Sequence, residues 1–346
     1  MADDSPGTPV ASAIVLNYNG RGFVLEAVQS LLAQDLRGLE VLVVDNGSTD
    51  GSGDEIGRTF AGRVRLIRAP QNLGFGAGNN LGIRQARGAC LILLNNDAVA
   101  TPSFAREMVA AAEADERVGM VAARVLDYSR RNVLDTVGHL LYPDGLNRGR
   151  GRLEEDRGQY SDCRTALFPS GAAALYTRRM LDDIGLFDEC FFLYGDDAEL
   201  GLRGRVAGWT CAFAPRAIAY HHYSRSAGAY SSLKAFYVER NRVLVLFRLF
   251  PVSLILVSPA YTAVRLALQA WGALSGRGAA GRLARDISIP RLVAVALRAY
   301  ASALRALPHV VRERWRHRRQ RRLPTLEFVR LLAEFRLSAW DAALKD

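Results

Sequence analysis

Two short apolar runs in the first hundred residues each end at a polar turn that carries a carboxylate. The runs are Val41–Val44 and Leu91–Leu94, and they are followed by Asp45-Asn46-Gly47-Ser48 and by Asn95-Asn96-Asp97. Runs of four to eight β-branched and aliphatic residues are typical of strands buried on both faces of a parallel sheet. Ligands of such sheets bind beyond the carboxyl ends of the strands. The pattern therefore places both carboxylates where a ligand is expected, not in a core.

The same pattern continues as an alternation of strands and helices as far as Tyr128. Strand-like runs are Val10–Leu16, Val41–Val44, Val64–Ile67, Cys90–Leu94 and Val118–Val125. Helical spacing is found at Val24–Leu32, Asp54–Phe60, Ala77–Ala86 and Ser103–Ala114. Alternating β and α elements of this length predict an α/β fold with a doubly wound, mostly parallel sheet.

The pattern changes beyond Tyr128. Residues up to about Tyr160 are polar and rich in glycine, and Pro143-Asp144-Gly145 predicts a turn within a loop or hairpin excursion. Regular elements then resume, as a strand at Ala172–Tyr176, a helix at Ala198–Ala207, and strands Thr210–Ala214 and Ala217–His221 separated by Pro215. After Leu233 the spacing is helical.

The last third of the chain predicts a separate, membrane-associating helical extension. With 346 residues the chain can form one large core and a smaller appended unit, and we expect units at 1–250 and 251–346. Leu244–Trp271 is apolar but is interrupted by Arg248, Pro251, Pro259 and Arg265. Because a spanning helix needs roughly 20 apolar residues with few charges, we favour helices that lie on or partly in the interface. A buried helical hairpin is the alternative.

The net charge of +10 changes this picture little, because the basic excess is concentrated late in the chain. Seven arginines lie within Arg312–Arg322, next to apolar helices and to Trp315. That arrangement favours an anionic membrane surface over nucleic acid. The N-terminus shows no secretory signal, and the four cysteines lack C-x-x-C spacing, so we expect reduced thiols and a cytoplasmic protein at the inner face of the cell membrane.

Polar residues after the first two strands are candidates for nucleotide recognition. Asn17 and Asn19 follow the first strand, and Asp45 and Asn46 follow the second. Adjacent strand ends bring these groups to one crevice, where amides and a carboxylate can bind the edge of a nucleobase. The alternative is an Asn-Gly turn that caps the next helix.

Two further loops suit a phosphate and a cation. In Asn72–Asn80, glycines such as Gly74 permit close approach of the backbone, although the spacing does not match a dinucleotide-binding fingerprint. A flexible turn with a helix cap is the alternative. In Asn95-Asn96-Asp97, the carboxylate can bind Mg²⁺ or Mn²⁺ that is shared with a diphosphate, or it can form an Asx turn.

Three carboxylates gather in Tyr194–Leu200, ahead of a predicted helix. Asp196 and Glu199 have the spacing of a capping box, which leaves Asp197 as a candidate general base. His221 and His222 end the last strand within a motif that runs to Ser226. A histidine pair is more often structural, but one of the two can join Asp97 on a single cation.

In order along the chain, these motifs resemble the inverting family 2 glycosyltransferases of the GT-A fold, and among them the rhamnosyltransferase-like group. The resemblance covers Val10 to about Pro251. It rests on Ile14–Asn19, Val43–Gly51, Asn72–Phe75 with Asn80, Leu94–Asp97, Gly171–Ala173, Tyr194–Leu200, Ala207–Trp209 and Arg240-Asn241.

The resemblance implies a role for each matching position. Asn17, Asn19, Asp45, Asn46, Gly74, Asn80, Asn96 and Asp97 would bind a nucleotide-diphosphate sugar. Asp97, together with His221, would hold Mg²⁺ or Mn²⁺. Asp197 would deprotonate the acceptor hydroxyl, and Gly171, Asp196 and Trp209 would contact the acceptor. His221, Arg240 and Asn241 would contact the diphosphate or serve the structure.

Two motifs depart from the family's pattern. The metal element is Asn-Asn-Asp in place of Asp-x-Asp, which leaves one acidic ligand there. The base element is Asp-Asp-Ala-Glu where relatives show Glu-Asp-x-Asp, and Asp197 aligns with the second acid.

The sequence thus favours a metal-dependent transferase that moves a sugar, such as rhamnose from dTDP-rhamnose, to a lipid-linked or polysaccharide acceptor in cell-envelope synthesis. A catalytically silent subunit that binds a sugar nucleotide or glycan is the alternative, and a homo-oligomer stays open. Binding of nucleic acid by the arginine-rich tail is the least favoured reading.

Overall fold

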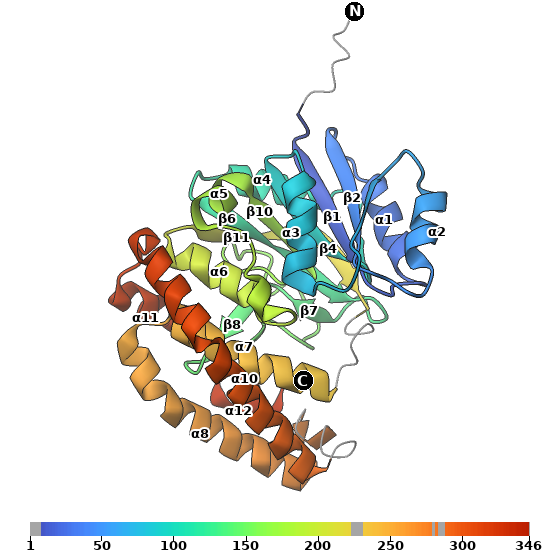
Figure 1. Ribbon diagram of the computed structural model, residues 1–346. Coiled ribbons are helices and arrows are strands. Elements are labelled where there is room, and N and C mark those ends of the chain that lie inside the picture. Colours follow the sequence, from blue (N-terminus) through green and yellow to red (C-terminus); the bar gives the residue numbers. More distant parts are fainter. Residues whose placement is uncertain (1–7, 223–230, 279–280, 283–287, 346) are drawn as a thin grey trace, which may run out of the picture.

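The computed structural model describes residues 8–222, 231–278, 281–282 and 288–345. Within these ranges, a nine-stranded sheet covered by helices is followed by a helical region at the C-terminal end (Figure 1). The first and last residues, and Tyr223–Ser226 of the histidine motif, lie outside the described residues.

The elements have the following bounds. The strands are β1 Ala11–Asn17, β2 Leu39–Asp45, β3 Arg65–Arg68, β4 Cys90–Asn95, β5 Ala98–Ala100, β6 Val118–Asp127, β7 Leu134–Thr136, β8 His139–Leu141, β9 Asn147–Gly149, β10 Ala173–Thr177 and β11 Thr210–His221. The helices before the C-terminal region are α1 Val24–Leu32, α2 Ser52–Thr59, α3 Phe75–Gln85, α4 Phe104–Glu113, α5 Arg178–Ile184, η1 Glu189–Phe191 and α6 Asp196–Val206. Those that follow are α7 Ser232–Leu249, α8 Val252–Ser275, α10 Ile289–Arg316, η2 His317–Gln320, α11 Thr325–Glu334 and α12 Ala339–Leu344.

The α/β fold class is confirmed, but the sheet is more mixed than the expected mostly parallel one. Its order is β3-β2-β1-β4-β10-β6-β11-β5, with β7 paired to β6. Strands β1 to β4 are parallel, whereas β10 runs antiparallel between β4 and β6. The chain reaches β10 through the excursion at 128–172, where a small β8–β9 hairpin forms, and not through a crossover helix. An antiparallel neighbour needs no such crossover.

Alternate residues of the strands pack into separate cores on the two faces of the sheet. On one face, Ala13 and Val15 of β1 share a core with Phe104 of α4. On the other face, Ile14 shares a core with Ile83 of α3. Burial on both faces explains why these strands are continuous apolar runs. It leaves the carboxyl edge of the sheet as the place where polar side chains gather.

The last strand corrects one expectation. Pro215 does not divide two short strands, because β11 is continuous from Thr210 to His221. The pairing of β11 with β6 shifts register between Ala214 and Ile218, so the proline lies in an irregularity where a missing backbone donor costs little. The uninterrupted strand carries His221 to the carboxyl edge.

Beyond β11, the described residues are predominantly helical, and α7 packs against both α6 and α10. The helical part thus begins before 251, and the proposed division at 250 stays a prediction. By length and composition, α8 is the one helix in the described residues that is apolar enough to cross a membrane, and little of it is buried. Its Arg265, however, is fully buried. It bonds Asp144, in the excursion after β6, and Glu239 of α7, each at 2.7 Å. These ion pairs hold α8 against the rest of the protein.

Replacement of Arg265 by methionine should lower the free energy of unfolding by about 3 kcal/mol, because it removes one of the two guanidinium groups that pair with buried Asp144 and Glu239 and leaves only Arg242 beside them. Burial raises the pKa of Glu239, but the neighbouring Arg265 and Arg242 lower it to about 2. The stabilisation is therefore present above about pH 4.5 and is lost as the pH falls toward 2. Urea denaturation between pH 7 and pH 3 measures this, with exposed Arg298→Met as a control. Equal losses in both variants would contradict the prediction.

Candidate functional site

A cavity of about 870 Å³ opens at the carboxyl edge of the sheet and extends toward the C-terminal helices. Side chains from β4, β11, the start of α6 and the loop before α3 face it. The lining residues that matter for chemistry are Asn46, Gly74, Asn96, Asp97, His139, Gly171, Asp196, Asp197 and His221. One cavity therefore joins the candidate metal ligands to the candidate base.

Asp97 and His221 form a pair that fits a divalent cation. His221 Nε2 lies 3.2 Å from Asp97 Oδ1, and both side chains are buried. On its other side His221 Nδ1 lies 2.7 Å from Asp135 Oδ2, and Asp135 in turn pairs with Arg152. A carboxylate behind the imidazole fixes its ring and aims Nε2 toward the site, as in many metal centres.

The charges around His221 show the same preference for a cation. Burial lowers the pKa of its imidazole, but hydrogen bonds with Asp135 and Asp97 outweigh it and raise the pKa to about 10. The two carboxylates thus create a position that favours positive charge. With Nε2 deprotonated, the imidazole nitrogen and the neighbouring Asp97 carboxylate oxygen are of the donor types that bind Mn²⁺ or Mg²⁺.

A second group of metal-ligating residue types lies away from this cavity. It consists of Asp188, Cys190 and His309, whose ligand atoms all lie within 4.8 Å of one another. Asp188 forms an ion pair with Arg248, and Arg240 donates to the carbonyl of Cys190. Because guanidinium groups already neutralise this group, we interpret it as a structural link between η1 and α10.

The two adjacent aspartates at the start of α6 have different surroundings. Asp197 is partly exposed to the cavity, and its carboxylate accepts from the backbone N–H of Gly171 at 3.1 Å and of Ala198 at 2.8 Å. Asp196 is buried, and desolvation together with the nearby Asp197 raises its pKa. Its Oδ2 has no hydrogen-bond partner in the described part of the chain. Of the two, Asp197 is placed to meet a substrate.

The turn before α6 is strained, and a buried asparagine holds it. Phe192, Tyr194 and Gly195 have φ angles of 64°, 62° and 76°. Left-handed conformations cost energy for residues with a Cβ and persist only where their surroundings impose them. Here the side-chain amide of Asn241 donates to the carbonyls of Phe191, Leu193 and Tyr194 at 2.6–3.0 Å. Asn241 is thus a positioning residue for the turn that presents Asp197.

Replacement of Asn241 by alanine should lower kcat about tenfold or more while leaving the donor KM nearly unchanged, since small misplacements of a catalytic group are costly. Gln34→Ala is the matched control, because it also removes amide hydrogen bonds, but beside α4. Steady-state kinetics with thermal melting separates lost positioning from lost stability. A kcat unchanged in Asn241→Ala would exclude this role.

Residues expected to bind the donor bond one another at the ends of β1 and β2. Asn17 pairs with Asp45 in the β1–β2 register, and its amide donates to Ser48 and Ser52. Asn96 donates to Asn17 at 3.2 Å, and Asn19 accepts from the backbone of Thr49. The resulting network holds three strand ends together beside the cavity.

The neighbouring loop is fixed in the same way. Asn46 donates to Asn72 and to the carbonyl of Gly74. Gly74 has a φ of 84°, and a Cβ there would lie 2.3 Å from the carbonyl oxygen of Phe192. Only glycine allows this approach, which joins the donor loop to the turn before Asp197.

Asn80 and Trp209, which were expected to contact the donor and the acceptor, and Arg240, which was expected to contact the diphosphate or serve the structure, lie elsewhere. The Asn80 amide bonds the backbone of Phe187, the Trp209 indole donates to Asp183 at 2.8 Å, and Arg240 bonds Cys190 and Ser302. None of these side chains lines the cavity. Their contacts are structural, so they do not enter the proposal below.

Two residues of the site had no signal in the sequence. Asp135, behind His221, and His139, which lines the cavity, both come from the polar excursion interpreted as a loop or hairpin. Burial lowers the pKa of His139, although Asp197 and Asp135 act in the opposite direction. Neither residue belongs to a recognisable motif, and only the fold brings them to the site.

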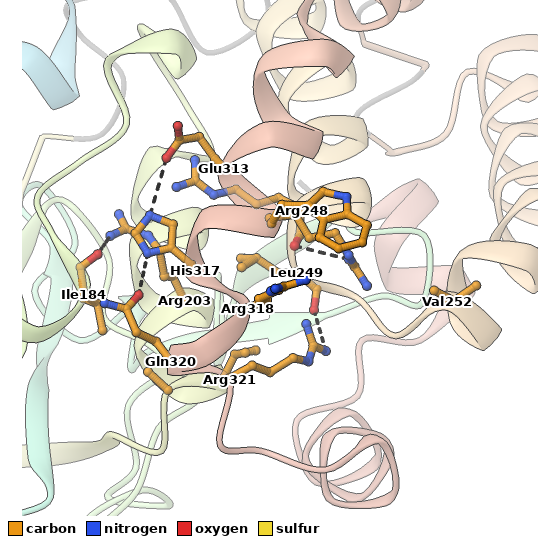
Figure 2. A pocket seen from close by; sticks show the side chains of 14 residues that line it. Ile184, Arg203, Arg248, Leu249, Val252, Glu313, His317, Arg318, Gln320 and Arg321 are labelled. Carbon is orange, nitrogen blue, oxygen red and sulfur yellow. Dashed lines mark hydrogen bonds and ion pairs between the residues drawn. The ribbon is translucent and has the colours of Figure 1, made fainter.

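Part of the arginine-rich tail lines a smaller cavity of about 460 Å³ (Figure 2), where its arginines have structural partners. Arg321 donates to the carbonyl of Leu249, and Arg314 donates to those of Phe247 and Phe250. These are the unsatisfied carbonyls at the end of α7, where basic side chains are favourable. Arg312 and Arg316 remain largely exposed. The tail therefore serves helix capping as well as any surface interaction.

Comparison with known sequences finds one family profile and several relatives. The sequence profile described as glycosyl transferase family 2 matches residues 12–185, just over half of the chain. An N-acetylglucosaminyl-diphospho-decaprenol L-rhamnosyltransferase of Mycobacterium tuberculosis is 26% identical over 245 residues, which cover 64% of this chain and 78% of that protein. The O-antigen biosynthesis protein RfbC of Myxococcus xanthus is 32% identical over 241 residues, which cover 64% of this chain. The match spans only 18% of RfbC, and 25% of an uncharacterised protein of Sinorhizobium fredii that is 31% identical.

Solved structures show the same fold. GalNAc-T7, determined with UDP, GalNAc and Mn²⁺, superposes with a TM-score of 0.60 at 16% identity over 77% of this chain and 51% of that one. A mannosyltransferase from Pyrobaculum calidifontis, in complex with GDP-Man and Mn²⁺, superposes with a TM-score of 0.50 at 18% identity over 98% of this chain and 87% of that one.

Proposed function

Because the chain belongs to glycosyl transferase family 2 and is a glycosyltransferase, we propose that it moves one sugar from a nucleotide-diphosphate donor with inversion at the anomeric carbon. The single observation that carries this proposal is that Asp97, His221 and Asp197 line one cavity. Cation ligands and a base that line one cavity suit a reaction in which a diphosphate leaves and a hydroxyl attacks.

In this reaction Asp197 accepts the proton of the acceptor hydroxyl while that oxygen bonds to the anomeric carbon. The bond between this carbon and the diphosphate oxygen breaks on the opposite face, so the configuration inverts. Asp97 and His221 would hold Mg²⁺ or Mn²⁺, which supplies neutralising charge for the diphosphate. The turn of Phe192–Gly195, held by Asn241, keeps the base in place.

Donor binding is proposed at the ends of β1 and β2. Asp45, with Asn17 and Asn19 beside it, would contact the nucleobase, and Asn46, Gly74 and Asn96 would contact the sugar and phosphates. Gly171 and Asp196 would border the acceptor. The mycobacterial relative supports rhamnose as the sugar and an acceptor built on a lipid diphosphate, in synthesis of a cell-envelope glycan.

A transfer assay with purified protein tests the proposal. Wild type is incubated with Mn²⁺, a panel of nucleotide sugars that includes dTDP-rhamnose, and N-acetylglucosaminyl diphosphate lipid; mass spectrometry identifies the transferred sugar, and NMR of the purified product gives its anomeric configuration. A product one deoxyhexose heavier, with the opposite anomeric configuration from the donor, is expected. Retention of configuration would overturn the mechanism, and transfer of another sugar would overturn the donor.

We further propose that α8 and α10 bind the inner face of the cell membrane peripherally. Exposed apolar residues on α8 include Leu256 and Leu274, which are 75% and 79% exposed. Replacement of both by glutamate should weaken binding to phosphatidylglycerol vesicles about tenfold or more, because their burial in the interface is lost. Vesicle flotation measures this, and Val10→Glu, at an exposed position just before β1, should bind as wild type. If both variants bind the vesicles equally well, the proposal that α8 and α10 bind the membrane is wrong.

A further inference from the structure

The catalytic cavity continues beyond the site into the helical region. Its lining includes Ala270 and Ala273 of α8 and Leu292 and Ala296 of α10, in addition to Asp197 and the cation ligands. Helix α7 contacts α6, which carries Asp197, and it also contacts α10 (Figure 1). The apolar space is therefore continuous with the position where the acceptor hydroxyl must lie.

The chemistry of the lining changes along this path. Around Asp197 the walls carry carboxylates, amides and imidazoles, whereas the walls from α8 and α10 carry mainly small or aliphatic side chains. Arg242 lies between these parts, where it bonds Glu239 of α7 and the hydroxyl of Tyr300 on α10. A ligand that fills the whole cavity must have a polar head and an aliphatic tail.

The outer faces of the same helices show where such a ligand can come from. Leu256 and Leu274 of α8 and Leu297 and Leu304 of α10 are between 64% and 79% exposed. Apolar side chains thus occupy both the outward surfaces of these helices and the cavity between them. An aliphatic chain could pass from a membrane into the cavity with little contact with water.

We propose that the apolar part of the cavity, between α7, α8 and α10, binds the aliphatic chain of a lipid-linked acceptor and so delivers its head group to Asp197. This inference rests on the proposed glycosyl transfer to a lipid-linked acceptor and adds to it the place where the acceptor's chain binds. It assigns to α8 and α10 a direct role in substrate binding, beyond attachment to a membrane.

Photocrosslinking tests this without relying on catalysis. The full-length protein is mixed with phosphatidylglycerol vesicles that contain a long isoprenyl diphosphate bearing a diazirine in its chain, and labelled residues are mapped by mass spectrometry. Labels are expected on Ala270, Ala273, Leu292 or Ala296. Excess unlabelled long-chain isoprenyl diphosphate should compete, while dimethylallyl diphosphate and additional phosphatidylglycerol should not.

Matched substitutions identify the cavity as the binding site. Ala273→Phe and Ala296→Phe fill the cavity and should reduce labelling about tenfold, because extra atoms do not fit beside a bound chain. Ala267→Phe and Ala294→Phe, at exposed positions of the same helices outside the cavity lining, should label as wild type. Melting curves identify any variant that fails to fold. The competition experiment uses only the wild-type protein, so its result does not depend on these variants.

The outcomes distinguish this inference from the proposed function. Labels confined to outward residues such as Leu256 would overturn the inference. Competition by phosphatidylglycerol would also overturn it, because the cavity would then bind bulk membrane lipid. Specific labelling of the cavity without any glycosyl transfer would retain the lipid site and reject the proposed function.

Discussion

Replacement of Asp197 by asparagine should reduce the rate of glycosyl transfer by about 10²–10⁴-fold, the usual contribution of a general base. Asparagine keeps the shape of the side chain and one oxygen that can accept from the backbone of Gly171 or Ala198, so the start of α6 should remain intact. It cannot take up the proton of the acceptor hydroxyl. The loss should therefore fall on kcat, with the donor affinity close to that of wild type.

Asp196→Asn provides the control for this experiment. Burial and the neighbouring Asp197 raise the pKa of Asp196, which favours its neutral form, and asparagine resembles a neutral carboxylic acid. We expect this variant to lose less than about tenfold in kcat, a small effect for a group that does not move the proton. Single-turnover kinetics and donor titration by calorimetry measure both variants. Full activity in Asp197→Asn, or a larger loss in Asp196→Asn, would reject Asp197 as the base.

Removal of the proposed cation should be nearly as damaging. Treatment with a chelator should abolish transfer, and Mn²⁺ should restore it, because the leaving diphosphate then lacks its neutralising charge. Asp97→Ala and His221→Ala should each lower kcat/KM by about 10²–10³-fold, corresponding to several kcal/mol of stabilisation. Activity measured as a function of Mn²⁺ concentration shows whether the loss lies in metal binding.

Two further variants test whether the Mn²⁺ requirement depends on Asp97 and His221. Asp135→Asn leaves both proposed ligands in place but removes the carboxylate behind His221, and should raise the Mn²⁺ requirement about 10–100-fold. His309→Gln alters the second group of metal-ligating types, and the Mn²⁺ requirement should not change. If the Mn²⁺ requirement changes in His309→Gln but not in Asp97→Ala, the metal site lies at the group of Asp188, Cys190 and His309 and not at Asp97.

The sequence predicts this site well where polar residues directly follow buried strands. Because the ends of adjacent parallel strands must meet, the positions of Asn17, Asp45 and Asp97 along the chain were enough to predict one polar edge. The antiparallel course of β10 was not predictable in this way. A strand buried on both faces has the same apolar pattern in either direction.

Roles that depend on long-range packing could not be predicted. Asp135 reaches His221 across 86 positions of the chain. The family resemblance names Asn241 as a diphosphate contact or a structural residue, but the turn that it holds, about 50 positions earlier, could not be read from the sequence. Their roles depend on side-chain direction and on backbone carbonyls, which have no sequence pattern of their own. Trp209 shows the converse, since it lies in a motif typical of the family but bonds Asp183 away from the cavity.

The buried Arg265 also bears on how the protein is made. An arginine near the centre of an apolar helix costs about 2.5–3.5 kcal/mol during insertion by a translocon, which disfavours threading of α8 across a bilayer. Its partners Asp144 and Glu239 precede it in the chain, so a ribosome synthesises both before α8 emerges. The partners of Arg265 are therefore present in the chain before α8 is complete. A single cationic side chain can therefore determine the topology of an otherwise membrane-compatible segment.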